Sequence, residues 1–288
     1  MSLERHGYVA GPDIATALYL MRELGRPLLV EGDAGVGKTE IAKVLASILE
    51  TELIRLQCYE GLDVHTALYE WDVQRQLLRL RVEQAAGADA DALEQRIFSR
   101  EYLLERPLLR ALTREEGPAV LLIDEIDRAD DAFEAFLLEV LSDFQVSIPE
   151  LGVVHAAHVP HVILTSNRTR ELGDALRRRC LYLYIDHPSV EKEIAILTAR
   201  VPELDGALAR DIARFMHTLR GRSLVRTPGV AETLDWARAL LGLERTLLDP
   251  EVVRDTLGCI IKDRADARQI ASLGTEALLR EAGVRATA

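Results

Sequence analysis

The sequence predicts a doubly wound α/β fold with a five-stranded parallel sheet, followed by an all-helical C-terminal domain. Up to about residue 185, short apolar segments alternate with segments of helical periodicity, and beyond that point only helical patterns remain. Near-continuous apolar runs are typical of parallel strands that helices cover on both faces. Strands separated by helices imply right-handed crossovers. We therefore expect two domains, residues 1–187 and residues 188–288.

Each element of this fold has its own signal. Five apolar segments predict the buried strands: 27–31, 52–57, 119–124, 161–167 and 181–186. Helical periodicity in the α/β domain covers Pro12–Gly25, Lys38–Glu50 and Asp131–Phe144. The C-terminal domain has five helical segments: Ser189–Val201, Asp205–Leu219, Gly229–Leu241, Asp249–Ile261 and Asp266–Ala282. Pro188 followed by Ser189 predicts a hinge and the N-cap of the first of these helices.

Two segments interrupt the simple alternation of strand and helix. Residues 66–112, between the second and third strands, form a helical stretch that is longer than one crossover needs. Residues 144–160, before the fourth strand, alternate apolar and polar side chains around Pro149-Glu150-Leu151-Gly152. That second pattern predicts a β-hairpin.

Composition limits the class of protein. The chain is acidic, with 47 Asp and Glu against 35 Lys and Arg, which weakly disfavours a nucleic-acid binder, although local basic patches could still bind phosphates. Cys58, Cys180 and Cys259 lie far apart, so we interpret them as small buried side chains rather than a disulfide framework or a zinc site. With no signal-peptide pattern and no apolar run of about 18 residues, we expect a cytoplasmic protein without a membrane span.

A glycine-rich motif carries the clearest chemistry. "GDAGVGKT", Gly32 to Thr39, matches G-x-x-x-x-G-K-[ST] directly after a predicted strand and before a predicted helix. Glycines let backbone N–H groups curl around phosphates, and the helix N-terminus adds its positive dipole end. Lys38 is then expected to reach the β- and γ-phosphates, and Thr39 to coordinate Mg²⁺. The motif predicts a nucleoside triphosphate site.

A pair of carboxylates indicates hydrolysis rather than binding alone. "AVLLIDEID" ends an apolar strand with Asp124, where a carboxylate is costly unless it lies at the ligand-binding edge of the sheet. Asp124 is expected to hold Mg²⁺ through water, and Glu125 to orient and deprotonate the attacking water. The alternative for Glu125 is an ordinary solvated acid at a helix start.

Further polar residues allow two interpretations each. Asn167 ends "VILTSN" and either helps to place the water or is a turn residue. Arg177, Arg178 and Arg179 either complete a solvated helix C-terminus or include an arginine that acts on a neighbouring subunit. Arg226 either approaches the phosphates from the helical domain or is a surface arginine before a helix N-cap.

The order of these motifs resembles the AAA+ ATPases over nearly the whole chain. The long insertion after the second strand and the hairpin before the Asn167 strand resemble the MoxR family. Four segments are similar to its CoxD type, the accessory ATPases for maturation of molybdenum–copper carbon monoxide dehydrogenase and its relatives. These segments are "RPLLVEGDAGVGKTEIAK", "LQCYEGLD", "ALYEWDVQRQLLRLR" and "DEIDRADDAFEAFLLEVLSDFQVSIPELG".

The resemblance implies a set of ATP and Mg²⁺ contacts. Thr39 and Asp124 would serve the metal, and Tyr8 and Val9 would meet adenine. The phosphate-loop contacts would be Gly32, Asp33, Ala34, Gly35, Val36, Gly37, Lys38, Thr39 and Glu40.

The resemblance also assigns catalytic roles. Glu125 would activate the water and Asn167 would be the first sensor. Arg179 best matches the arginine finger, with Arg178 second. Arg226 would be the second sensor, although "LVRTPG" departs from the "SPR" of many MoxR proteins.

The partners implied are a homo-oligomer, by family habit a hexameric ring, a von Willebrand factor A domain protein and a metalloenzyme client. We therefore expect an ATP-driven remodelling chaperone for metalloenzyme maturation. The alternatives are a DNA-handling AAA+ motor and, less favoured, a small-molecule kinase. The hairpin argues against DNA because it contains no Lys or Arg, and we interpret His155, His158 and His161 as edge-strand residues. Trp71 either fills a helix–helix contact, which we favour, or faces a partner.

Overall fold

A computed structural model describes residues 3–85, 93 and 96–284 of the chain. It divides into two compact units. The first unit contains Met1–Gly11, Gly32–Ile41 and Tyr184–Ala288, and the second contains Pro12–Glu31 and Ala42–Leu183. The domain boundary between residues 187 and 188 stays a prediction.

The predicted five-stranded sheet is present. Its strand order is β2-β5-β8-β1-β9, and each pairing along β2-β5-β8-β1 is parallel. The strands coincide with the five predicted apolar segments to within one residue at each end: β1 (Leu28–Gly32), β2 (Leu53–Gln57), β5 (Val120–Asp124), β8 (His161–Ser166) and β9 (Leu181–Ile185). β1 and β5 flank β8, so the carboxyl ends of these three strands lie at one edge of the sheet.

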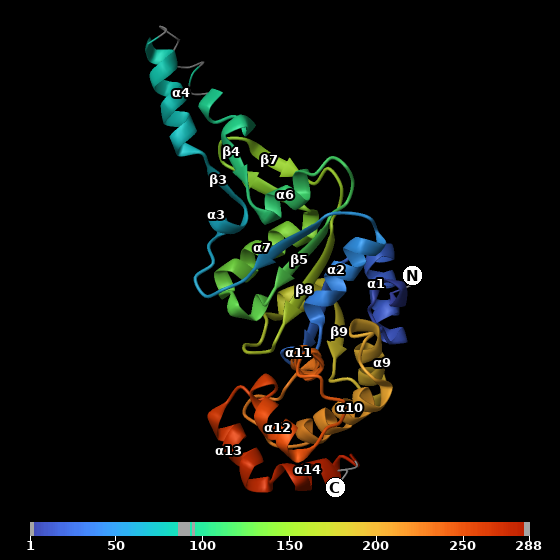
Figure 1. Ribbon diagram of the computed structural model, residues 1–288. Coiled ribbons are helices and arrows are strands. Elements are labelled where there is room, and N and C mark those ends of the chain that lie inside the picture. The colour runs from blue at the N-terminus through green and yellow to red at the C-terminus, as the bar shows by residue number, and fades with distance from the viewer. Residues whose placement is uncertain (1–2, 86–92, 94–95, 285–288) are drawn as a thin grey trace. The chain divides into compact units, whose positions relative to one another are not determined.

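Helices cover both faces of this sheet, as the right-handed crossover rule requires. α2 lies over one face and α6 and α7 lie over the other (Figure 1). The helices that accompany the sheet are α1 (Pro12–Leu24), α2 (Lys38–Ile48), α6 (Pro107–Thr113), α7 (Asp131–Asp143) and α8 (Asp174–Arg179). Side chains of β5, α6 and α7, among them Leu121, Leu108 and Phe133, form one buried core. Each large apolar side chain buried there contributes about 1.5–3 kcal/mol of transfer free energy.

The insertion of residues 66–112 is not the continuous helical stretch that its periodicity predicts. It contains α3 (Val64–Ala67), β3 (Tyr69–Trp71), α4 (Val73–Ala85), a 3₁₀ turn η2 (Arg100–Tyr102) and β4 (Leu103–Glu105) before α6. β3 and β4 pair antiparallel. Tyr69 and Trp71 share one face of β3, and aromatic side chains favour such a pleated surface over a helix. Residues 86–92 and 94–95 of the predicted stretch lie outside the described residues.

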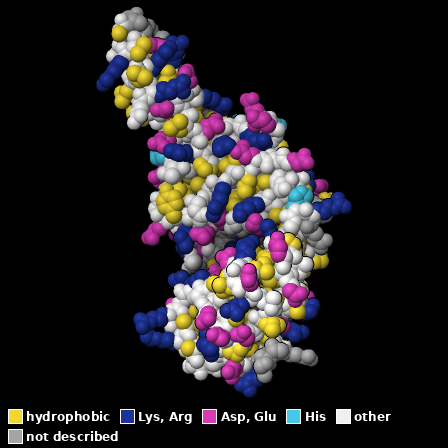
Figure 2. Space-filling model, viewed as in Figure 1, with side chains coloured by type: hydrophobic (Ala, Val, Ile, Leu, Met, Phe, Trp, Pro, Cys, Tyr) yellow, Lys and Arg dark blue, Asp and Glu magenta, His cyan; other side chains and the backbone are white. Residues whose placement is uncertain are grey.

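Trp71 lies in this two-stranded ribbon and not in a helix–helix contact. Its ring packs edge-on against Tyr69 and Phe98, with centroid separations of 6.1 and 5.5 Å. The following helix α4 exposes Val73, Leu77, Leu78 and Val82. Hydrophobic and basic side chains lie together on this part of the surface (Figure 2).

The predicted hairpin before β8 is confirmed as β6 (Gln145–Ile148) paired antiparallel with β7 (Gly152–His155). Gly152 has φ +76°, a left-handed conformation that favours glycine in the turn. His155 ends β7 and His158 lies in the following loop. His161 begins β8, which lies between β5 and β1, so its assignment to an edge strand is wrong. No group of potential metal ligands occurs among the residues that the structure describes.

The C-terminal region is helical, as predicted, with two changes in its boundaries. It contains α9 (Val190–Arg200), α10 (Gly206–Arg220), α11 (Val230–Gly242), α12 (Pro250–Thr256), α13 (Arg264–Leu273) and α14 (Thr275–Glu281). The helix predicted to reach Ile261 becomes a 3₁₀ turn, η4 (Leu257–Cys259), after Thr256. The segment predicted as one helix over Asp266–Ala282 is two, because Gly274 has φ +80° and ends α13.

Trp236 and Phe215 lie in the separate core of these helices. Ser189 caps α9 as predicted, accepting the Lys192 N–H. Among the described residues, no helix has both the length and the apolar composition to cross a membrane.

Candidate active site

The phosphate loop belongs to the first unit and takes its shape from glycine. Gly35 and Gly37 have φ values of +77° and +95°, in the left-handed region. Gly32 is required for a different reason: a Cβ at this position would lie 2.3 Å from the carbonyl oxygen of Ile185, at the end of β9. The motif therefore meets steric demands of its own fold as well as those of a phosphate ligand.

Lys38 begins α2 and is buried. Its Nζ donates hydrogen bonds to the carbonyl oxygens of Gly32, at 2.7 Å, and Asp33, at 2.6 Å. The ammonium group is thereby held against the first two residues of the loop. Thr39 and Glu40 follow in the first turn of the helix, where both are half-buried.

The N-terminus of α11 contacts the phosphate loop directly within the first unit. The N–H groups of Val230 and Ala231 donate to the Gly35 carbonyl, at 2.9 and 3.4 Å. A Cβ on Gly229 would lie 2.7 Å from the Gly35 Cα, so the two glycines are in backbone contact. Glu232 accepts the Gly229 N–H at 2.9 Å. Sequence reasoning missed Gly229, although a Pro-Gly pair before a helix is a visible signal.

A buried ion pair fixes the segment that leads into α11. Arg220 forms two parallel hydrogen bonds to Glu193, at 2.6 and 2.7 Å, and both side chains are almost fully buried. The Thr233 hydroxyl also donates to Glu193, at 2.7 Å. Arg220 further donates to the carbonyls of Pro228 and Gly229, at 2.8 and 3.3 Å. This pair connects α9, α10 and α11 to the residues that touch the loop.

A histidine of the predicted hinge also reaches the phosphate loop. His187 Nε2 lies 3.3 Å from Asp33 Oδ2, although its buried ring nitrogens form no well-aligned hydrogen bond within the described residues. Burial, and then the charge of Arg220, lowers the pKa of His187, while Asp33 acts in the opposite direction. The ring is therefore neutral near physiological pH.

The remaining predicted contacts of the first unit are less defined. Tyr8 and Val9 are half-buried, and the Tyr8 N–H donates to the Leu3 carbonyl at 3.2 Å. Arg226 is exposed, and its N–H donates to the buried carboxylate of Asp266 at 2.9 Å. No hydrogen bond or ion pair of the Arg226 side chain occurs among the described residues. That Tyr8, Val9 and Arg226 contact the nucleotide stays a prediction.

In the second unit, Asp124 ends β5 as a buried carboxylate with two neighbours on adjacent strands. Its Oδ1 accepts the Thr165 hydroxyl at 2.5 Å. Its Oδ2 accepts hydrogen bonds from Arg55 Nε and Nη2, at 3.1 and 2.6 Å. Arg55 was not anticipated, although a charged residue inside the apolar segment 52–57 is a signal that could have been used.

Glu125 follows in a strained conformation. Its φ of 55° and ψ of 49° are left-handed, which costs a non-glycine residue about 1–3 kcal/mol and is common at functional sites. The Glu125 N–H donates to Thr165 Oγ1 at 3.0 Å, and its carboxylate lies 2.8 Å from Arg128 Nε. The Glu125 side chain remains partly exposed.

Asn167 follows β8 and is held by a residue that sequence reasoning did not single out. Buried Asp127 accepts the Asn167 N–H at 3.2 Å through Oδ1. Its Oδ2 accepts the N–H and hydroxyl of Thr169, at 2.9 and 2.6 Å. Asp127 and Thr165 therefore connect the loop of Asn167 to the turn of Asp124 and Glu125, and the structure brings these three predicted residues into one hydrogen-bonded cluster.

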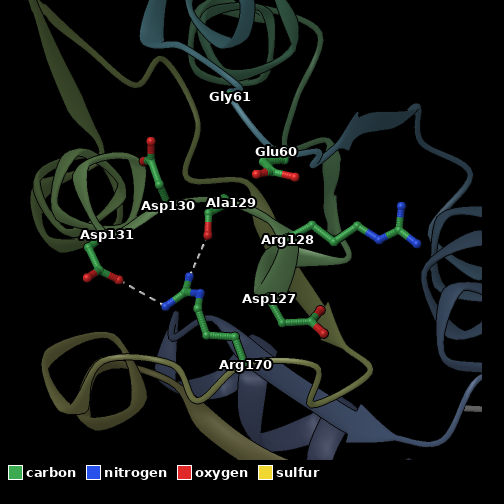
Figure 3. A pocket seen from close by; sticks show the side chains of 8 residues that line it. All are labelled: Glu60, Gly61, Asp127, Arg128, Ala129, Asp130, Asp131 and Arg170. Atoms are coloured by element: carbon green, nitrogen blue, oxygen red, sulfur yellow. Dashed lines mark hydrogen bonds and ion pairs between the residues drawn. The ribbon is translucent and has the colours of Figure 1, made fainter.

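A surface pocket of about 350 Å³ lies beside this cluster (Figure 3). Arg170 crosses it and donates to Asp131 Oδ1 at 3.0 Å and to the Ala129 carbonyl at 2.6 Å. Arg170 also pairs with the buried Glu134. The residues that line the pocket are Glu60, Gly61, Asp127, Arg128, Ala129, Asp130, Asp131 and Arg170.

The three consecutive arginines of α8 have different environments. Arg177 pairs with Glu31 at 3.0 Å. Arg179 donates to Ser142 Oγ at 2.6 Å and to the Ala175 carbonyl of its own helix at 3.3 Å. Arg178 is exposed. Arg178 and Arg179 therefore lie at the surface, as a residue acting on a second subunit must.

A family profile described as "AAA domain (dynein-related subfamily)" matches residues 27–180, which is more than half of the chain. The chain belongs to this AAA family. A gas vesicle ATPase GvpN of Haloferax mediterranei is 24% identical over 269 residues, covering 89% of this chain and 75% of the relative. An uncharacterized protein of Staphylococcus aureus is 25% identical over 260 residues, covering 86% of this chain and 88% of the relative.

The solved structure of a Thermotoga maritima RuvB mutant has the same fold. Its TM-score is 0.51 at 20% identity, and the match covers 95% of this chain and 81% of that chain. The family match and the GvpN ATPase relative support an AAA+ ATPase of the MoxR type. The likeness to RuvB confirms the predicted fold. The CoxD assignment stays a prediction.

Proposed function

We propose that this ATPase binds ATP through its phosphate loop, hydrolyses it with Asp124 and Glu125, and uses the energy to remodel a folded client protein. The observation that carries the proposal is the strained Glu125 turn, joined through Thr165 to the buried Asp124. The Glu125 carboxylate is partly exposed and lies beside the buried Asp124 carboxylate. This arrangement suits activation of a water molecule rather than nucleotide binding without hydrolysis.

The residues present fit ATP and Mg²⁺. Gly35 and Gly37 provide the left-handed turns that direct N–H groups toward phosphates, and Lys38 provides the cation. Thr39 and Asp124 supply the hydroxyl and carboxylate oxygens that Mg²⁺ prefers. The metal would neutralise charge that develops on the phosphates. Asn167 would orient the attacking water, and Glu125 would take its proton.

The proposal includes a homo-oligomer, expected to be a hexameric ring, in which Arg178 or Arg179 reaches the nucleotide of a second subunit. The support is that both residues are exposed and Arg179 contacts the neutral Ser142 hydroxyl, whereas Arg177 is ion-paired with the buried carboxylate of Glu31. AAA ATPases generally assemble as rings, which agrees with this arrangement.

The proposed client is a metalloenzyme of the molybdenum hydroxylase type, with a von Willebrand factor A domain protein as partner. The support is the resemblance carried by the insertion and the hairpin. The exposed apolar side chains of α4, in the same insertion, offer a contact surface for a protein.

A DNA-handling motor is the second candidate because of the fold shared with RuvB, a likeness that extends to the fold alone. The hairpin strands β6 and β7 contain no Lys or Arg. Salt-sensitive binding of single-stranded DNA would favour this candidate over protein remodelling.

The test begins with Glu125→Gln, which keeps the size of the side chain and removes the base. We expect ATP binding to persist while steady-state hydrolysis falls by about 10²–10⁴-fold, the usual contribution of a general base. Lys38→Ala is the matched control and should lose ATP binding. Normal turnover by the Glu125→Gln protein would exclude Glu125 as the water-activating residue.

The Glu125→Gln protein, loaded with ATP, then serves as bait in an extract of its own cells. Co-purification of a molybdenum hydroxylase precursor and an A-domain protein, lost in the Lys38→Ala bait, would support the client assignment. Recovery of gas vesicle proteins or DNA instead would contradict it.

A further inference from the structure

Strand β1 contacts the arginine-bearing helix α8 at both of its ends. Arg26 lies just before the strand, and Glu31 lies one residue before its end and directly before the phosphate loop. Both contacts are within the second unit. Neither residue belongs to the nucleotide-binding motif, and each has partners on or next to α8.

Arg26 binds the C-terminal end of α8. Its Nη2 donates to the Arg178 carbonyl at 2.7 Å, and its Nε donates to the Arg179 carbonyl at 3.2 Å. A third, longer bond of 3.4 Å reaches the Cys180 carbonyl. Carbonyls in the last turn of a helix lack intrahelical partners and carry partial negative charge, so a guanidinium is a suitable cap.

Glu31 binds the side chain of the first arginine in the run. This carboxylate is 3% exposed and accepts a hydrogen bond from Arg177 Nη1 at 3.0 Å and from the Tyr182 hydroxyl at 2.9 Å. The Arg177 guanidinium also lies over the Tyr182 ring, 5.4 Å from its centroid. Burial, and then the hydrogen bond to Glu31, raises the pKa of Tyr182. The hydroxyl therefore remains a donor.

These contacts determine the orientation of α8. A buried carboxylate is costly without partners, so Glu31 holds Arg177 in one position. Because Arg177 points toward β1, the next two arginines of the helix point elsewhere. Arg178 is exposed, and Arg179 lies against Ser142. A rotation or shift of α8 would break the Glu31 and Arg26 contacts together.

We propose that Glu31 and Arg177 are positioning residues that hold α8 so that Arg178 and Arg179 act on the nucleotide of a second copy of the chain. The inference rests on the proposed function in trans. It assigns different tasks to adjacent arginines: Arg177 acts within its own subunit, and the two that follow act on the neighbour.

The test uses two kinds of subunit in one mixed oligomer. The acceptor carries Arg178→Ala and Arg179→Ala and keeps its own phosphate loop. The donor carries Lys38→Ala, so it binds no nucleotide and contributes only its arginines. Hydrolysis in the mixture then reports on donor arginines at acceptor sites, because neither subunit alone has a complete site.

Arg177→Met is introduced into the donor only. We expect the restored hydrolysis to fall about tenfold or more, because a misplacement of roughly 1 Å costs up to about 10²-fold. Glu31→Gln in the donor should give a loss of the same kind, and Arg177→Lys a smaller one. Arg238→Met is the matched control, since Arg238 pairs with Asp235 on the exposed surface of α11. It should leave the restored hydrolysis unchanged.

Size exclusion and thermal unfolding select the donors that fold and assemble. If Arg177→Met does not fold, Arg177→Lys and Glu31→Gln carry the comparison. Full restoration by folded donors that carry these substitutions would overturn the positioning role alone. No restoration with the unmodified donor would contradict action in trans, and the inference with it.

Discussion

Thr165 joins the two carboxylate residues of the hydrolytic turn through one hydroxyl group. That hydroxyl donates its one proton to Asp124 and accepts the Glu125 N–H, so a single group serves both residues. The second bond stabilises the left-handed conformation of Glu125. Neither function is visible in the sequence, where Thr165 is one polar residue in a strand. Its importance depends on β8 lying beside β5.

At the same scale, the three cysteines should differ in reactivity. Burial, reinforced by Asp124, raises the pKa of Cys58 to about 12. Burial raises the pKa of Cys180 to about 12 as well. Because the thiolate is the reactive form, both should resist a disulfide reagent at about pH 8 in the folded protein. We expect Cys259, which is partly exposed, to react first.

Titration of the thiols before and after denaturation of the protein tests this prediction. The Cys259→Ser protein serves as the control. Rapid labelling of Cys58 or Cys180 in the native protein would contradict it.

At the scale of elements, contacts from α9 and α10 fix the residues that lead into the N-terminus of α11. The Glu193–Arg220 pair joins α9 and α10, and Arg220 also binds the two residues that precede α11. A buried ion pair is often no more stable than an apolar substitute. Here its geometry gives it a separate task, which is to place the carbonyls of Pro228 and Gly229.

Glu193→Ala should therefore destabilise the protein by about 3–5 kcal/mol, the cost of leaving a buried arginine without its partner. Urea denaturation monitored by Trp fluorescence is the measurement, since Trp236 lies in the same helical core. Glu191→Ala, at an exposed position on the same helix, is the control. A loss below about 1 kcal/mol, the range of a surface pair, would show that Arg220 finds other partners.

At the scale of the whole molecule, stability should depend on pH through histidine. Burial, and then the charge of Arg22, lowers the pKa of His161. The unfolded chain therefore binds a proton at a higher pH than the folded one, and stability falls as pH decreases through the usual histidine value of about 6.5. Burial likewise lowers the pKa of His187.

His161→Gln should flatten the decline in unfolding free energy between about pH 7.5 and 5.5. Denaturation at several pH values tests this, with His6→Gln, a substitution at an exposed position, as the comparison. If the unfolding free energy of the His161→Gln protein depends on pH as steeply as that of the unmodified protein, this histidine does not contribute to the pH dependence.

The sequence predicted the sheet, its strand boundaries and the hairpin because each depends on a local period or a turn residue. It failed in the insertion, where Tyr69 and Trp71 pair with a strand more than thirty residues away. It also missed Arg55, Asp127 and Gly229. Each of these acts through a contact between distant segments, and a single sequence records only the residue and not its neighbour.

The contact between Gly35 and Gly229 restricts how this protein can change. At most protein contacts a larger side chain on one side can be accommodated by a smaller one on the other. Here both residues are already glycine, the smallest residue. A Cβ on either one would lie 3.1 Å or less from the Cα of the other. Neither residue can become smaller to accommodate a side chain on the other, so we expect the two positions to vary neither singly nor together among functional descendants. A saturation library at both sites should return only the parental pair.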